Sequence, residues 1–295
     1  MGNLKNLYFF SQDIVLKRQS NQLAVYKDGK KHSAFPLSTF NSIFIYGKVE
    51  IKASLINFLL DNGKYIVFLN SKGIYRGFLF NRYTQSNNSK RLRQYEIYFS
   101  KEEKLNFAKQ LIFTKISKIE SIFNLNLKNK KIAFKKAKSF DTLLGIEGAA
   151  STLMFDKFKH LLVELKINFE GRSYKPPKDE INALLSSFYT AFHNRLIPEI
   201  YMEGLDPFLG LLHVKRGTHH ALVSDFMEII RPDITFLVYQ FLKEHPINEL
   251  NFEKYKEGFY LSFESLKVIH TWLVSNHMEK HIKFVKSYIE NSFCI

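Results

Sequence analysis

Hydrophobic residues follow one pattern in the first 80 residues and another in the rest of the chain. Up to residue 80, short runs of β-branched and aromatic residues alternate with turn residues, which is typical of strands. The expected strands cover residues 7–10, 13–19, 22–37, 42–47, 64–73 and 74–80. Asp28 and Gly29 predict a hairpin tip inside the third run. Residues 52–63 predict a helix in this region, ended by Gly63.

Beyond residue 91, apolar residues recur at spacings of three and four, as on one face of a helix. The expected helices cover residues 91–127, 180–197, 233–245 and 264–290, and a loop with Pro176 and Pro177 covers 168–180. Residues 81–91 are polar and show no periodicity. We therefore predict an α+β protein of two domains. A small β-rich N-terminal domain (1–85) precedes a linker (86–95) and an all-helical C-terminal domain (96–295).

The composition fits this size of protein and excludes several classes. Of 295 residues, 45% are hydrophobic and 15% aromatic, which is enough for a substantial core. Cys294 is the single cysteine, so a disulfide framework and a thiolate zinc site are both excluded. The N-terminal stretch lacks the apolar core of a signal peptide, and the longest apolar run is too short to span a bilayer. We expect a cytoplasmic protein that does not bind membranes.

Positive charge is concentrated in one part of the chain. The formal net charge is +15, and residues 82–140 hold 15 Lys and Arg but only 4 Asp and Glu. A basic segment of this size attracts phosphate backbones, so we favour nucleic acid over a membrane surface as the partner. The excess of Lys over Arg, together with many Asn, Ile and Phe, is also the composition that AT-rich coding drift produces.

Three short islands in the helical half carry candidate chemistry: "LLGIEGAAST" with Glu147, "GLLHVKRGTHH", and "LVSDFMEIIRP". Asp225 and Glu228 in the third island are three residues apart, so on a helix they share a face, and their neighbours are apolar. Two carboxylates there repel each other and lose solvent, and a divalent cation would remove both penalties. Carboxylates together with a histidine suit Mg²⁺ or Mn²⁺ better than Zn²⁺.

Simpler alternatives stay open at this level. Glu147 fits a satisfied core acid or a surface acid at a helix start, and His213 fits a core histidine bonded to a carbonyl. The acids of the third island could form ordinary ion pairs with Lys215, Arg216 or Arg231. His219 and His220 lie in a glycine-containing loop that favours solvation over metal binding. Spacing alone therefore does not choose between a metal site and these alternatives.

Five segments in order resemble the CRISPR spacer-acquisition integrases, the Cas1 endonuclease family. They are "GKVEIKASLINFLLDNGKYIVFL", "LLGIEG", "YKPPKDEINALLSSFYT", "LLHVKRGTHH" and "SDFMEIIRP". Each motif is loose by itself, but the order of the last four behind a β-rich first domain is specific. Two details depart from the family pattern, namely the Leu in "DPFLGLLH" and the histidine pair in "RGTHH".

The resemblance implies a fold, a site and partners. The metal ligands would be Glu147, His213 and Glu228, with Asp225 as a second acid near a bound Mg²⁺ or Mn²⁺. The implied assembly is a homodimer formed through the first domains, joined with the small Cas2 partner in a heterohexamer on DNA. Basic residues near the motifs are the candidate DNA contacts: Arg172, Lys175, Lys215, Arg216 and Arg231.

The implied reaction inserts a short DNA fragment into a CRISPR array, when the fragment's 3′-hydroxyl attacks a phosphodiester at the edge of a repeat. No side-chain nucleophile is needed, which agrees with the lack of a Cys or Ser nucleophile motif. Two alternatives remain: a nuclease of the same fold that only cuts branched or linear DNA, and a non-catalytic scaffold that binds nucleic acid through its basic segment.

Overall fold

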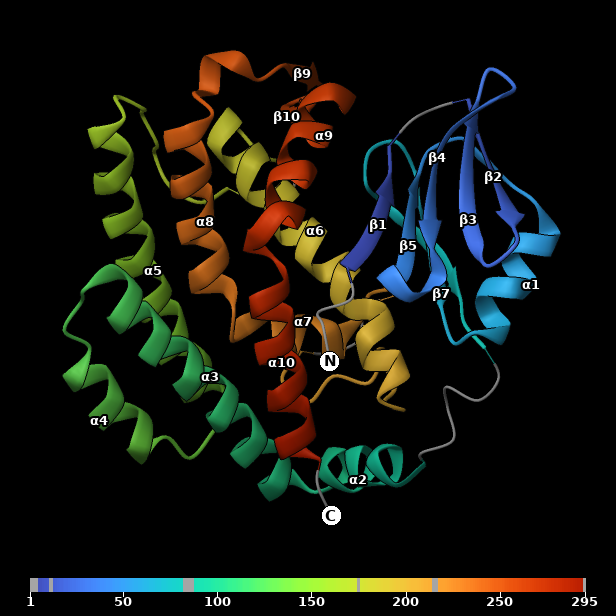
Figure 1. The fold of residues 1–295 in the computed structure, drawn as a ribbon. Coiled ribbons are helices and arrows are strands. Elements are labelled where there is room, and N and C mark those ends of the chain that lie inside the picture. The colour runs from blue at the N-terminus through green and yellow to red at the C-terminus, as the bar shows by residue number, and fades with distance from the viewer. Residues whose placement is uncertain (1–4, 11–12, 82–87, 174–175, 214–216, 294–295) are drawn as a thin grey trace. The chain divides into compact units, whose positions relative to one another are not determined.

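The computed structural model describes residues 5–10, 13–81, 88–173, 176–213 and 217–293. It divides into two compact units, residues 1–86 and 87–295. The first is rich in strands and the second is helical (Figure 1). The predicted fold class, a β-rich N-terminal region followed by a helical C-terminal region, is therefore confirmed.

The described residues of the N-terminal unit form two four-stranded sheets. One sheet has the order β1-β5-β7-β8 and the other β4-β3-β2-β6. In the first sheet, β1 and β7 run parallel to β5, and β8 is antiparallel to β7. The strands are β1 (Lys5–Phe9), β2 (Ile14–Gln19), β3 (Gln22–Lys27), β4 (Lys30–Pro36), β5 (Phe40–Tyr46), β6 (Val49–Ile51), β7 (Tyr65–Leu69) and β8 (Tyr75–Leu79). Helix α1 (Ala53–Asp61) adds Leu55, Phe58 and Leu59 to the core that these strands form.

The predicted hairpin tip is confirmed by the turn between β3 and β4. Asp28 and Gly29 alone separate the two strands, and both have positive φ, 50° and 74°. Two successive positive φ values define the turn that matches the twist of an antiparallel pair, which is why Asp-Gly is favoured there. Gly63, with φ 67°, likewise follows helix α1.

The helical unit contains nine α-helices within its described residues. They are α2 (Asn88–Phe99), α3 (Lys101–Phe123), α4 (Lys128–Lys136), α5 (Phe140–Glu164), α6 (Glu180–Met202), α7 (Ala221–Glu228), α8 (Arg231–Glu244), α9 (Phe263–Trp272) and α10 (Glu279–Ser292). Helix α3 packs against α5, α7 and α8, and α6 packs against α7 and α8. Short α7 thus lies among the long helices, as Figure 1 shows, and all eight of its residues are buried.

Three details of the helical unit correct the sequence-based expectations. The expected helix 91–127 is two helices, because Ser100 caps α3 and its hydroxyl accepts from the Glu103 N–H at 3.2 Å. The expected helix 264–290 is interrupted by a π-helical turn, η4 (Leu273–His277). The unit is also not purely helical, because β9 (Phe252–Tyr255) and β10 (Gly258–Leu261) form an antiparallel hairpin.

The expected linker, residues 86–95, is wrong over residues 88–95, which belong to α2. This helix is fixed to the helical unit by Gln94, whose side chain is fully buried. Its amide nitrogen donates to the carbonyls of Asp206 (2.9 Å) and Leu209 (2.8 Å), and its oxygen accepts from the Asp206 N–H at 2.8 Å. A polar residue in an apparent linker is therefore a structural part of the second unit. Among the described residues, no helix is long and apolar enough to cross a bilayer.

We expect Gln94→Ala to lower the free energy of unfolding by about 2–3 kcal/mol, because the Asp206 N–H and the Leu209 carbonyl lose their partner and the Asp206 carbonyl loses one of its two donors. Denaturant unfolding followed by circular dichroism is the measurement. Gln110→Ala on exposed α3 surface is the matched control and should change stability by less than about 0.5 kcal/mol. Equal stability of the two variants would show that α2 is not held by this contact.

Candidate metal and DNA site

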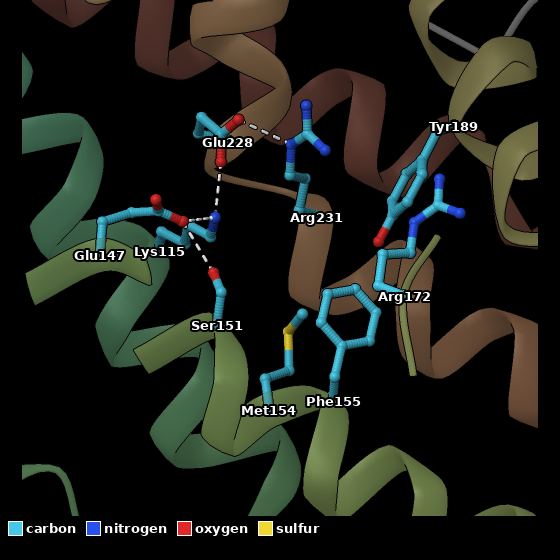
Figure 2. Close-up of a pocket in the computed structure, with 9 residues that line it drawn as sticks. All are labelled: Lys115, Glu147, Ser151, Met154, Phe155, Arg172, Tyr189, Glu228 and Arg231. Atoms are coloured by element: carbon cyan, nitrogen blue, oxygen red, sulfur yellow. Dashed lines mark hydrogen bonds and ion pairs between the residues drawn. The ribbon is translucent and has the colours of Figure 1, made fainter. Parts of the chain in front are cut away.

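The site is built from three helices whose acidic and basic residues meet around one ammonium group. Lys115 on α3 contacts Glu147 Oε1 on α5, and its Nζ lies 2.6 Å from Glu228 Oε2 at the end of α7. The side chains of Lys115 and Glu228 are 4% and 7% exposed, and that of Glu147 is 20% exposed. Figure 2 shows the two carboxylates on the same nitrogen. The structure therefore brings together two acids that lie 81 positions apart in the chain.

Each of these residues is held by the local fold. Glu147 lies well inside α5, and Ser151, one turn further on, donates to its Oε1 at 2.7 Å. Glu228 is the last residue of α7, and the chain then turns directly into α8, which begins with Arg231. The Nε of Arg231 lies 2.7 Å from Glu228 Oε1 as an ion pair. Both oxygens of Glu228 therefore face a cation.

Electrostatics keep the cluster ionised. Burial opposes ionisation of Glu228, but Arg231, Lys115 and His213 outweigh it and lower the pKa of Glu228 to about 2. Burial also opposes the charge of Lys115, but Glu228 and Glu147 raise its pKa above the ordinary value. Lys115 and Glu228, the two most buried members of the cluster, are thus each stabilised in their charged form by their neighbours.

Asp225 has a different role from Glu228, although both lie on α7. Its carboxylate is fully buried and accepts from the N–H groups of Leu211 (2.5 Å), Leu212 (3.0 Å) and His213 (2.8 Å). It also lies 2.8 Å from His213 Nδ1. The predicted second acid therefore fixes the segment that carries His213 and orients the imidazole ring.

His213 completes the set of sequence-predicted ligands. With Nδ1 held by Asp225, its other nitrogen, Nε2, lies 3.7 Å from Glu228 Oε1. Burial lowers the pKa of His213, but the bond to Asp225 and the charges of Asp225 and Glu228 outweigh this and raise it. Among the described residues, no group of three or more His, Cys, Asp and Glu is arranged to hold a metal as it stands. The acids converge on Lys115 instead.

A cavity of about 240 Å³ adjoins this cluster. Besides the cluster itself, it is lined by Ser151, Met154, Phe155, Arg172 and Tyr189 (Figure 2). The guanidinium carbons of Arg231 and Arg172 lie 5.2 and 5.7 Å from the ring centre of Tyr189. Arg172 also donates to the side-chain oxygen of Asn182 at 2.8 Å, which ties it to the start of α6. The lining of the cavity therefore combines two carboxylates with two guanidinium groups, and one of these, Arg231, is paired with Glu228.

The remaining candidates divide into two groups. Arg172 and Arg231, predicted as DNA contacts, both line the cavity. Lys175, Lys215 and Arg216 lie outside the described residues. His219 Nε2 lies 2.9 Å from the Ser224 hydroxyl, and His220 packs on Phe208.

Sequence reasoning missed Lys115, although a signal was present. Lys115 interrupts the buried stripe of α3, between Leu111 and Ile112 on one side and Ile116 and Ile119 on the other. A lysine at an apolar position of an amphipathic helix predicts a buried acidic partner. Spacing could not say which acids those partners are.

Comparison with known proteins identifies the family. The family model for CRISPR associated protein Cas1 matches residues 7–273. The chain belongs to the Cas1 family. A protein named CRISPR-associated endonuclease Cas1 1 from Thermodesulfovibrio yellowstonii is 32% identical over 278 residues, 88% of this chain and 86% of that protein. The predicted resemblance is therefore confirmed.

Solved structures share the fold of this Cas1 family member. A Cas1 protein from Thermotoga maritima superposes with a TM-score of 0.80 at 23% identity, covering 97% of this chain and 95% of that one. A casposase bound to integration product superposes with a TM-score of 0.79 at 18% identity, covering 98% of this chain and 90% of that one. A Cas6-RT-Cas1–Cas2 complex gives 0.74 at 20% identity, covering 99% of this chain and 36% of that one.

We expect Asp225→Ala to lower the free energy of unfolding by about 3–4 kcal/mol, because three N–H groups of the 211–213 segment lose their acceptor. Asp225→Asn keeps one carbonyl oxygen as acceptor and should lose roughly half as much. Ser224→Ala, at the neighbouring position, removes one bond to His219 and serves as the control, with a loss of about 1 kcal/mol. Denaturant unfolding measures all three. A stable Asp225→Ala protein would contradict the structural role assigned to this acid.

Proposed function

We propose that this Cas1 family member is a metal-dependent DNA endonuclease and integrase of CRISPR adaptation, which joins short DNA fragments into a CRISPR array. The observation that carries the proposal is the convergence of Glu147 and Glu228, from two helices, with His213 Nε2 beside Glu228. The names of the similar proteins, a CRISPR-associated endonuclease and a casposase bound to integration product, support the same class of reaction.

The donor set fits a hard divalent cation. Glu147 and Glu228 present carboxylate oxygens to the same point, where the ammonium of Lys115 now supplies the positive charge. Carboxylates with one imidazole suit Mg²⁺ or Mn²⁺, and the absence of a thiolate argues against zinc. Glu147, Glu228 and His213 would hold the ion. When bound, the ion would neutralise charge on a phosphodiester and lower the pKa of an attacking hydroxyl.

Residues of the chain prepare the rest of the site. Asp225 holds His213 through Nδ1 and thereby leaves Nε2 for a ligand. Arg231 and Arg172 line the cavity beside the acids, where guanidinium groups suit phosphate oxygens. Together they provide an acidic centre for the ion and a basic wall for the DNA strand.

Gly145 and Gly148 leave room for DNA beside Glu147. Both lie inside α5, where each glycine costs roughly 0.5–1 kcal/mol relative to alanine. Apart from chain neighbours and the helix's own backbone, no described atom lies within 4 Å of the Cβ that alanine would add at either position. Packing within the chain therefore does not require these glycines, which favours close approach of a substrate at this side of the acid.

The partners of the chain are part of the same proposal. The basic segment, residues 82–140, supplies the phosphate-binding surface for DNA. A complex whose name includes both Cas1 and Cas2 contains a chain of this fold, which supports Cas2 as partner. A homodimer formed through the N-terminal units and a heterohexamer with Cas2 remain predictions, as does the cytoplasmic location.

We expect Glu147→Ala, His213→Ala and Glu228→Ala each to abolish joining of a labelled DNA fragment to a supercoiled target, even at high Mn²⁺. Each removes one donor from a three-donor site. Asp156→Ala, an exposed acid on the same helix as Glu147, is the control and should keep wild-type activity. A gel separates the outcomes, because joining gives a larger labelled product, whereas plain cleavage gives only shorter ones. Unchanged joining by all three variants would overturn the assignment of these residues as metal ligands, whereas no joining even by the wild type would favour the non-catalytic scaffold.

Duplex binding should depend steeply on salt and on where the lysines lie. If the chain neutralises about six phosphates, affinity should fall roughly a thousandfold between about 50 and 200 mM salt. On a plot of log affinity against log salt concentration, this dependence is a slope. Replacing the exposed Lys135, Lys136 and Lys138, at and just after the end of α4, by Gln should make that slope shallower by up to about 3. The matched control replaces exposed Lys27, Lys30 and Lys31 of the N-terminal hairpin and removes the same charge. Fluorescence anisotropy measures the affinity for duplex DNA. If the two triple variants lose the same affinity, net charge controls binding and the basic segment 82–140 has no special role.

A further inference from the structure

Lys115 occupies an unusual position for a lysine. It is 3% exposed, lies in the apolar stripe of α3, and makes ion pairs with two acids from two other helices. Lysine is almost never buried to this extent unless it is paired. The acids that it pairs are Glu147 and Glu228, which the proposed function assigns to the metal.

The contacts of Lys115 use the atoms that a metal would need. Its Nζ contacts Oε1 of Glu147 and Oε2 of Glu228, while Arg231 lies against the other oxygen of Glu228. A divalent cation bound between the two acids would lie against the ammonium, and repulsion between cations at such separations is strong in a buried site. Metal and ammonium therefore compete for the same position.

A path away from the acids is available to the ammonium. Lys115 lines the 240 Å³ cavity, together with Ser151, Tyr189 and the hydrophobic side chains of Met154 and Phe155. A lysine side chain has four rotatable carbon–carbon bonds, so its charge can leave the carboxylates while the backbone of α3 stays in place. The cavity adjoins the site at which the DNA phosphate is proposed to bind.

We propose that Lys115 is an internal counter-ion that holds the metal position in the metal-free protein and swings into the adjoining cavity when Mg²⁺ or Mn²⁺ binds. The inference rests on the proposed function, because it takes Glu147 and Glu228 as metal ligands. It explains how two neighbouring acids are compensated before the metal arrives, and it makes Lys115 a determinant of metal affinity.

The first test compares Lys115→Met with Lys118→Met in the full-length protein. Methionine keeps the length and apolar stem of lysine but not its charge. Lys118 is the matched control: it lies on the same helix, and its Nζ pairs with Asp233 at 2.7 Å, away from the acids. We expect Lys115→Met to bind Mn²⁺ about tenfold or more tightly than wild type, because no ion pair must be broken. Lys118→Met should bind like wild type. Isothermal titration with Mn²⁺ alone measures the affinities.

Thermal unfolding gives a second readout that does not involve activity. Without metal, Lys115→Met should melt below wild type, because two carboxylates lose a cation. Saturating Mn²⁺ should remove most of that difference and should raise the midpoint of the variant more than that of wild type. Lys118→Met should show the same small Mn²⁺ shift as wild type.

The third test uses the wild-type protein, so it can test the movement of Lys115 even if Lys115→Met does not fold. An amine-acylating reagent with mass spectrometry measures how fast each lysine reacts. Because the ammonium of Lys115 is buried against the acids, we expect slow labelling without metal and at least about tenfold faster labelling with Mn²⁺. Lys118 should keep one rate under both conditions. Unchanged labelling of Lys115 under conditions where Mn²⁺ binds would overturn the inference.

The outcomes separate the two proposals. Mn²⁺ binding of equal strength in wild type and Lys115→Met overturns the counter-ion inference and leaves the metal site intact. If neither protein binds Mn²⁺, the proposed metal-dependent function fails and the inference fails with it. Tighter binding by Lys115→Met that disappears in the double variant with Glu147→Gln supports both.

Discussion

Neutralising two neighbouring carboxylates, one buried and one partly buried, is the constraint around which the helical unit is arranged. Glu147 and Glu228 are brought together from α5 and α7, and an acid removed from water needs a cation or donors at close range. Lys115 on α3 and Arg231 on α8 provide those charges. Four helices that are scattered along the chain thus meet at one charge-balanced point. Helix α3 packs against the other three, and α8 packs against α5 and α7.

Balanced charge has a consequence for function. A site already compensated by its own cations can fold without metal, yet it keeps oxygen ligands ready at one position. The two cations differ in kind: Arg231 is a planar group at the start of α8, whereas Lys115 is a compact charge on a flexible stem. This difference suits Arg231 to stay near the phosphate and Lys115 to move. Asp225 pairs with neither of these cations, because its oxygens accept hydrogen bonds from the backbone of residues 211–213.

The space around the acids supports the same interpretation. On one side, no side chain projects from Gly145 or Gly148 of α5, and the space that a Cβ would occupy at each is open. On the other, Arg172, Tyr189 and Arg231 form the wall of the cavity. An acidic centre between an open helix surface and a basic, aromatic wall is suited to a nucleic acid strand whose phosphate reaches a metal ion.

The sequence by itself determined the elements that local chemistry specifies. The Asp28-Gly29 hairpin, the long amphipathic helices and the helical position of Asp225 and Glu228 all follow from short-range patterns. Two expected boundaries were wrong, since α2 replaces the expected linker and Ser100 divides an apparently continuous helix. Polar residues such as Gln94 look like linker residues until their distant carbonyl partners are known.

Only the tertiary structure decided how the candidate site is assembled. Periodicity showed that Asp225 and Glu228 share a helix, but one acid holds a backbone segment and the other faces Lys115 and Arg231. The family resemblance pointed to Glu147, His213 and Glu228, yet neither it nor the spacing named Lys115 as their counter-ion. Ion pairs between residues separated by 32 and 113 positions depend on how helices pack, and packing is a property of the whole chain.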